Sequence, residues 1–213
     1  MLYQVIKVIL HKLKYGAINN KKIIMFLLGL CVIGIISGSI FITLIKSSDK
    51  TSIINYINDF ISNIGKIDIK NALINSLLAN IIFTLIIWLL GISVIGIPII
   101  LFMYFSKLFI LGFTISSFIL TYKLKGLLFA FLYVFPTQVI NILIYTLISL
   151  YAIKISNNLI YTTFNKKDTN FKKITNKYIK ILIICLICIL LNSLYESVIL
   201  PFILNKVILL LKI

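Results

Sequence analysis

The sequence contains no arginine, a single histidine and only five acidic residues among its 213 residues. The histidine, His11, stands in a lysine-containing segment near the amino end, so the long apolar runs lack the histidine that a serine or cysteine triad or an H-E-x-x-H zinc motif requires. An aspartyl-type pair needs two carboxylates in one site, and Glu196 is the only acidic residue inside an apolar run. The sequence therefore predicts a protein that is not an enzyme and uses no cofactor.

The absence of arginine also bears on the large positive charge. All 21 basic residues are lysines, and the formal net charge is +16 at pH 7. Nucleic-acid binding favours arginine forks and exposed aromatic side chains on a soluble face, whereas these lysines stand mainly between apolar runs. We expect no nucleic-acid partner and interpret the charge as contact with anionic lipid.

Cysteine is equally scarce. Cys31 lies inside one apolar run, and Cys185 and Cys188 form a C-x-x-C motif embedded in the run ILIICLICILL. A redox or metal-binding C-x-x-C needs a polar, accessible setting with partner ligands. The three cysteines are therefore interpreted as small apolar packing residues, and no metal site is expected.

Apolar side chains are abundant, with 61% hydrophobic residues, 12% charged residues and a mean hydropathy of +1.14. A helix needs about 20 apolar residues to cross a hydrocarbon core about 30 Å thick. The sequence predicts an all-α, polytopic membrane protein with about five transmembrane helices in one domain, residues 1–213. The predicted spans are residues 23–45, 72–90, 98–121, 126–151 and 181–203.

Glycine and proline mark the connection between the second and third spans. Gly91 is suited to end a helix, and Pro98 has the fixed φ and missing N–H that suit the start of a new helix. Between them, residues 92–97, which include Gly96, can form a tight turn. One kinked helix through this region would need about 50 residues to cross one bilayer, which is too long at 1.5 Å per residue. Only residues 122–125 separate the third span from the fourth.

Two further segments carry apolar residues at helical spacing but are too short and too polar to cross a membrane. Residues 2–14 and residues 52–64 are therefore predicted to be amphipathic helices in the membrane interface. The alternative for residues 2–14 is a short helix packed on the protein's own cytoplasmic loops.

The lysines near the span ends predict the orientation. With the amino terminus in the cytoplasm, twelve lysines fall on cytoplasmic segments and eight on outer ones, while Asp49, Asp59 and Asp68 fall outside. Five spans then place the carboxyl terminus outside the cell.

Two charged residues interrupt the spans. Lys107 lies about 14 Å into the third span, and Glu196 lies about 22 Å into the fifth span from the same side, at 1.5 Å per residue. A lone charge at such depth costs at least about 2.5 to 3.5 kcal/mol. We therefore expect Lys107 and Glu196 to pair, although either could instead extend toward the lipid headgroups or be neutral.

Other polar or small residues in the spans are expected to join helices. Gly34 and Gly38 stand four residues apart and permit close helix contact. Interhelical hydrogen bonds are expected from four amides, with a transport path as the alternative: Asn80, Gln138, Asn141 and Asn192. An odd number of spans and the lack of a visible repeat argue against a transporter, although a homodimer would supply the missing symmetry.

The most distinctive blocks of the sequence are LGISVIGIPIILFMYFSKLFILGFTIS, KGLLFAFLYVFPTQVI and LYESVILPFIL. In this order they resemble the stage II sporulation protein M family, membrane proteins of endospore-forming bacteria. The resemblance covers nearly the whole chain and is strongest from Leu90 to Ile140. The family's recurring positions fall on Gly96, Pro98, Lys107, Gly112, Phe113, Lys125, Gly126, Pro136, Glu196 and Pro201, whereas Leu108 stands where relatives often carry a small residue.

The resemblance implies a membrane scaffold. Such proteins help to assemble a complex with two peptidoglycan hydrolases, an amidase and a lytic transglycosylase, for engulfment of the forespore. The implied location is the mother-cell membrane at the sporulation septum and the engulfing membrane. Partners are expected to dock on residues 51–64 and the loop at Lys123, or within the bilayer along Gly34 and Gly38. The alternative function is a small permease or channel component that uses Lys107 and Glu196.

Overall fold

The computed structural model describes residue 7 and residues 21–64, 68–165 and 171–211. All elements that these residues form are helical, which confirms the predicted all-α fold. The elements are α2 (Lys21–Leu44), α3 (Ser47–Asn63), α4 (Ile69–Leu90), α5 (Gly96–Asn165), α6 (Phe171–Leu194), the π-helix η2 (Tyr195–Ile199) and α7 (Leu200–Leu211). The predicted interfacial helix at residues 2–14 lies outside the described residues, apart from Lys7.

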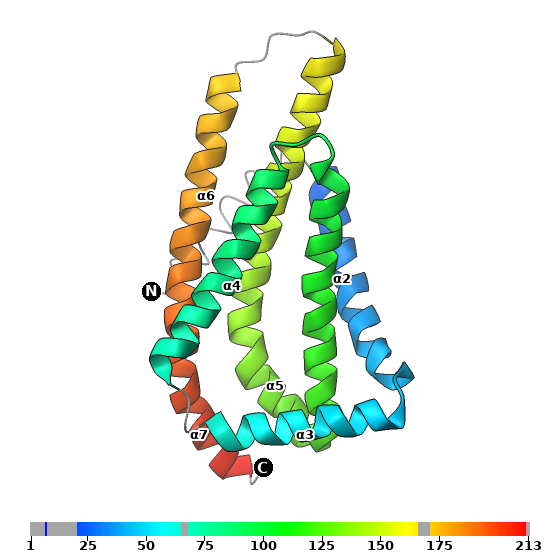
Figure 1. The fold of residues 1–213 in the computed structure, drawn as a ribbon, viewed down its shortest axis with the longest axis vertical. Helices are drawn as coiled ribbons and strands as arrows, with labels where there is room; N and C mark the ends of the chain where they lie inside the picture. Colours follow the sequence, from blue (N-terminus) through cyan, green and yellow to red (C-terminus); the bar gives the residue numbers. More distant parts are fainter. Residues whose placement is uncertain (1–6, 8–20, 65–67, 166–170, 212–213) are drawn as a thin grey trace.

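Among the described residues, four helical stretches are long and apolar enough to cross a membrane. They are Lys21–Leu44, Ile69–Leu90, Gly96–Thr162 and Ile174–Val207. The third stretch is two helices, because the backbone at Lys123 leaves the helical region with φ 52°. Figure 1 shows α5 running to the end of the bundle and turning back there. The first half of α5 (residues 96–122) and its second half (124–165) therefore account for two of the five predicted spans.

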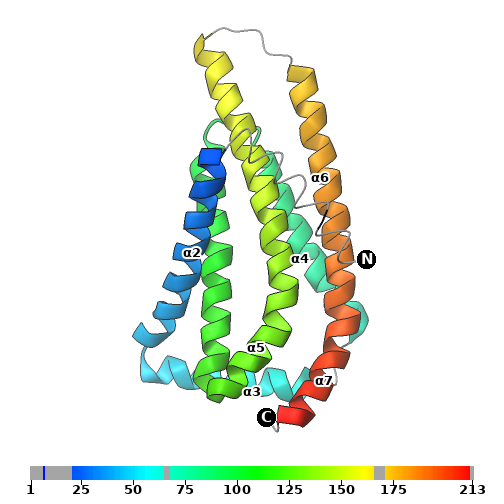
Figure 2. The same ribbon diagram turned by 180° about the vertical axis from the view of Figure 1, so that it is seen from behind.

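Successive spans run in opposite directions, as the sequence predicts. α2 runs toward the end of the bundle where α3 lies, α4 returns, the two halves of α5 run there and back, and α6 runs there again (Figures 1 and 2). We call this end the α3 end, and we call the opposite end, where α5 ends and α6 begins, the hairpin end. The α3 end corresponds to the predicted outer side, and the orientation itself stays a prediction.

The last two spans are longer than expected. The fourth helix continues past residue 151 to Asn165, and the fifth begins at Phe171 and continues through η2 and α7 to Leu211. The lysines at residues 152–180 suggested a loop. However, buried side chains such as Ala152, Ile155 and Tyr178 continue at helical spacing beyond the apolar windows, so the helices extend with them.

The turn before α5 follows the expected glycine and proline signals with a small shift. Gly91 caps α4, and α5 begins at Gly96, two residues before the predicted start at Pro98. Proline is tolerated in this first turn because its N–H would have no helical partner there. A Cβ on Gly91 would overlap the Tyr178 hydroxyl and lie 2.8 Å from the Cα of Ala152. Gly91 therefore lets three helices approach one another at this point.

α3 lies across one end of the bundle, nearly at right angles to the spans (Figure 1). Its buried residues Ile57 and Ile61 join a small core cluster with Phe129 and Leu204, which come from the second half of α5 and from α7. The Tyr122 hydroxyl donates a 2.6 Å hydrogen bond to the side chain of Asn58. The amphipathic helix predicted at residues 52–64 is thus present, begins five residues earlier, and packs on the reversal of α5.

Candidate functional site

Small residues bring α2 and the first half of α5 into backbone contact, which we call the glycine seam (Figure 2). A Cβ on Gly38 would overlap the carbonyl oxygen of Phe109, and one on Gly112 would overlap that of Ile35. A Cβ on Gly34 would lie 2.8 Å from the Cβ of Leu108.

The glycine seam corrects one expectation. Gly34 and Gly38 are buried against α5, so partners cannot dock along them in this conformation. Leu108 is only 1% exposed and lies opposite Gly34. The larger residue at position 108 is accommodated because glycine faces it.

Lys107 points its charge at aromatic faces. Its ammonium nitrogen lies 4.8 Å from the centre of the Phe83 ring on α4 and 5.8 Å from that of Tyr145 on the second half of α5. The two rings themselves pack edge to face, with centres 4.6 Å apart. A desolvated cation over such rings gains about 2 kcal/mol or more, which offsets part of the cost of placing the lysine in the span.

Glu196 belongs to the π-helix η2, which ends two residues before Pro201. Proline removes a backbone donor, and its ring would clash with the carbonyl four residues earlier in a regular α-helix. The wider π-turn accommodates this, and the Leu200 N–H bonds to the carbonyl of Tyr195 instead. The Glu196 carboxylate accepts a 2.7 Å hydrogen bond from the Ser76 hydroxyl on α4.

A chain of polar contacts connects these two charged residues. The Tyr145 hydroxyl donates a 2.5 Å bond to the Asn80 side chain, whose amide nitrogen donates a 3.4 Å bond to the Ser76 hydroxyl. Lys107 and Glu196 are within electrostatic reach of each other, but in the described part of the chain they form no direct ion pair. The expected pair is therefore replaced by an indirect link through Tyr145, Asn80 and Ser76, which we call the polar seam.

The other predicted amides lie close to this seam. The Asn192 side chain donates a 3.0 Å bond to Asn141 and a 3.3 Å bond to the carbonyl of Thr137, so this pair joins α6 to α5 as expected. Pro136 is inside the second half of α5, one residue before that carbonyl. Gln138 is half-buried and forms no hydrogen bond within residues 21–64, 68–165 and 171–211.

α4 and the second half of α5 run parallel in a fixed register. Two hydrogen bonds join residues that are 65 apart in sequence, Asn80 with Tyr145 and Gly91 with Ser156. The same offset sets Thr84 opposite Ser149. Both hydroxyl oxygens are buried and have no partner in the described residues. The polar seam therefore extends toward the hairpin end through two unsatisfied groups.

Glu196 also lines a cavity of about 190 Å³ at the α3 end. Its walls come from α3, α4, α5, η2 and α7, and they include Phe60, Tyr133, Ser197 and Leu200. Phe60 and Tyr133, whose ring centres lie 5.4 Å apart, also line a second, larger and mainly apolar cavity.

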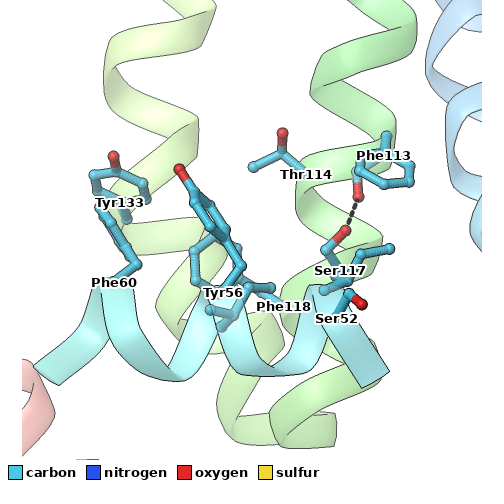
Figure 3. A pocket seen from close by; sticks show the side chains of 10 residues that line it. Ser52, Tyr56, Phe60, Phe113, Thr114, Ser117, Phe118 and Tyr133 are labelled. Atoms are coloured by element: carbon cyan, nitrogen blue, oxygen red, sulfur yellow. Dashed lines mark hydrogen bonds between the residues drawn. The ribbon is translucent and has the colours of Figure 1, made fainter. Parts of the chain in front are cut away.

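The larger cavity lies between α3 and the two halves of α5 and has a volume of about 430 Å³. Phe113 from the glycine seam and Tyr56 line it beside Phe60 and Tyr133, and Ser117 bonds to the Phe113 carbonyl at its edge (Figure 3). Gly126 lies at the reversal of α5, where a Cβ would overlap the Phe118 carbonyl. The reversal thus closes tightly just beyond this cavity.

The sequence indicated Lys107, Glu196 and the amides, but it did not indicate Ser76, Phe83, Tyr133 or Tyr145. The spacing of Ser76, Asn80 and Thr84, each four residues apart in an apolar span, was the available signal for one polar helix face. Within the described residues, no three histidine, cysteine or acidic side chains gather as a metal site would require.

The fold and the polar seam define a multi-pass, all-α membrane protein with a charged and hydrogen-bonded cluster inside its helix bundle. The family model of SpoIIM, stage II sporulation protein M, matches residues 23–201. The chain therefore belongs to this sporulation family, as its sequence blocks indicated, and the match includes both Lys107 and Glu196. No curated protein and no solved structure matches the chain.

Proposed function

We propose that this protein is a non-enzymatic scaffold that recruits and localises peptidoglycan hydrolases, an amidase and a lytic transglycosylase, during engulfment of the forespore. The observation that carries the proposal is α3, a helix held across one end of the bundle with its polar face outward. Exposed polar residues of that face include Thr51, Asn55 and Asp59. A rigid bundle that presents such a face is suited to binding extracytoplasmic partners.

The rest of the molecule is compatible with this role. Spans held by backbone contact at the glycine seam and by hydrogen bonds at the polar seam form a fixed frame rather than a reactive centre. We place the protein in the mother-cell membrane at the sporulation septum and in the engulfing membrane. Lysines at the hairpin end, such as Lys177 and Lys180, would contact anionic lipid, and a homodimer would double the number of docking faces.

Recovery of partners from sporulating cells tests the scaffold. The tagged chain, extracted in mild detergent, is expected to retain both hydrolases, and absence of both would contradict the proposal. Asn55→Ala should lower the recovered amount by about fivefold or more, the effect of losing an interface residue worth about 1 kcal/mol. Asn157→Ala is the matched control, because Asn157 is also exposed and lies near the carboxyl end of α5, away from α3.

A second candidate, a small permease or channel component, is favoured by one observation. The hydroxyls of Thr84 and Ser149 are buried without partners on the polar seam, a position where water could enter between Glu196 and the hairpin end. Replacing Lys107 by Met and Glu196 by Gln together should abolish flux through a permease. A scaffold carrying the same two changes should still fold and localise.

A further inference from the structure

The Glu196 cavity differs from the rest of the bundle, because it contains a carboxylate whose only described direct partner is one hydroxyl group. We infer that this cavity is a docking socket for a single lysine or arginine side chain on a membrane-spanning helix of a partner protein. This deepens the proposed scaffold function, because it names the side chain that a recruited partner presents.

Charge complementarity is the first argument. An ionised carboxylate accepts several hydrogen bonds, and Glu196 receives one, from Ser76. Lys107, the cation within electrostatic reach, sits against Phe83 and Tyr145 instead of the carboxylate. A charge in a membrane span is stabilised by an opposite charge, so an incoming cation would supply what the described residues leave unmet.

The size and lining of the cavity are the second argument. Its volume of about 190 Å³ is below the range of about 300 to 1,000 Å³ typical of small-molecule sites, and it suits one side chain. Leu200, Pro201 and Leu204 provide apolar walls for a methylene stem, while the Tyr133 ring and the carboxylate suit a cationic end.

The lysine that follows the socket on α7 is directed elsewhere. The Lys206 ammonium lies over the Phe202 ring, 4.8 Å from its centre, and no direct ion pair joins it to Glu196 among the described residues. Neither Lys107 nor Lys206 therefore fills the socket, which leaves it open to a cation from another helix.

The test uses a designed probe and no hydrolase, so it can fail independently of the scaffold proposal. The purified full chain, labelled with a donor dye, is placed in phosphatidylcholine vesicles with acceptor-labelled leucine-rich transmembrane peptides. One peptide carries a lysine near its outer end, and the other carries methionine there. Energy transfer should show about tenfold tighter association of the lysine peptide, the lower end of measured couplings between close charges.

Three variants decide where the peptide binds. Glu196→Gln should remove the preference for lysine. Ala72→Leu, which fills the cavity wall and keeps the carboxylate, should also remove it even if Glu196→Gln unfolds the chain. Asp59→Asn removes one negative charge from the exposed face of α3 and should leave the preference unchanged. Equal association of the two peptides, or a preference that survives in both Glu196→Gln and Ala72→Leu, would overturn the inference.

Discussion

The glycine seam and the polar seam hold neighbouring parts of the same bundle by opposite means. At the glycine seam, α2 and α5 approach until backbone meets backbone, and Ser39 donates a side-chain hydrogen bond to the carbonyl of Gly112. At the polar seam, α4, α5 and η2 are joined through Ser76, Asn80 and Tyr145. Apolar lipid gives helices no hydrophobic reason to associate, so close packing and polar contacts are the two available means.

The two seams differ in how completely their groups are packed or hydrogen-bonded. The glycine seam has no free space, because a Cβ added at Gly34, Gly38 or Gly112 would meet α5 or α2 directly. The polar seam leaves Glu196 with a single partner and leaves Thr84 and Ser149 with none in the described chain. Stability is therefore expected to depend most on the glycine seam, and interaction with other molecules on the polar seam.

The largest expected effect is at the glycine seam. Gly38→Ala forces a Cβ against the backbone of Phe109 and should cost about 1 to 3 kcal/mol by overpacking. The midpoint of thermal unfolding in detergent should fall accordingly.

Gly29→Ala is the control on the same helix, because a Cβ there meets nothing within 4 Å. It should be neutral or stabilising by about 0.5 to 1 kcal/mol, since alanine favours a helix interior over glycine. Equal destabilisation by both changes would mean that the loss comes from helix propensity or insertion rather than from close contact.

At the polar seam, the Asn80–Tyr145 hydrogen bond should show the strongest pairwise coupling. At 2.5 Å it is short and buried, and measured bonds between membrane helices average about 0.6 kcal/mol with a maximum near 1.7. A double-mutant cycle with Asn80→Ala and Tyr145→Phe should give about 1.5 kcal/mol, read from unfolding midpoints. Additive effects would show that the two side chains contribute independently.

The two charges should couple less than this neutral pair. Lys107→Met and Glu196→Gln, combined in the same kind of cycle, should give about 0.5 to 1 kcal/mol, because their link runs through other residues. Close charge pairs measured elsewhere couple by about 1.5 to 7 kcal/mol. A value in that upper range would mean that the ammonium and the carboxylate meet directly in the membrane.

Periodicity and length predicted most of the fold, since apolar runs, Gly91 and the lysine-flanked reversal at residues 122–125 are local signals. The helical residues 152–165 and 171–180 were missed because lysines interrupt the run there, although Ile155 and Tyr178 keep a buried face. At the site, depth along each helix predicted that Lys107 and Glu196 lie within reach of each other, and the structure has them within electrostatic reach. Depth carries no information on rotation about the helix axis, so it could not show that aromatic rings from α4 and α5 would meet the lysine first.

The smallest expected effect tests whether the polar seam is fully packed or contains an ordered water. Thr84→Val and Ser149→Ala each remove a buried hydroxyl that has no partner in the described residues. Replacing an unsatisfied polar group by an apolar one of similar shape is nearly neutral or stabilising, so the unfolding midpoint should stay within about 0.5 kcal/mol of the parent or rise. If an ordered water bridges the two hydroxyls, each change should instead destabilise by about 1 kcal/mol or more, because the water loses partners. That result would make the polar seam continuous from Glu196 toward the hairpin end and would favour the permease over the scaffold.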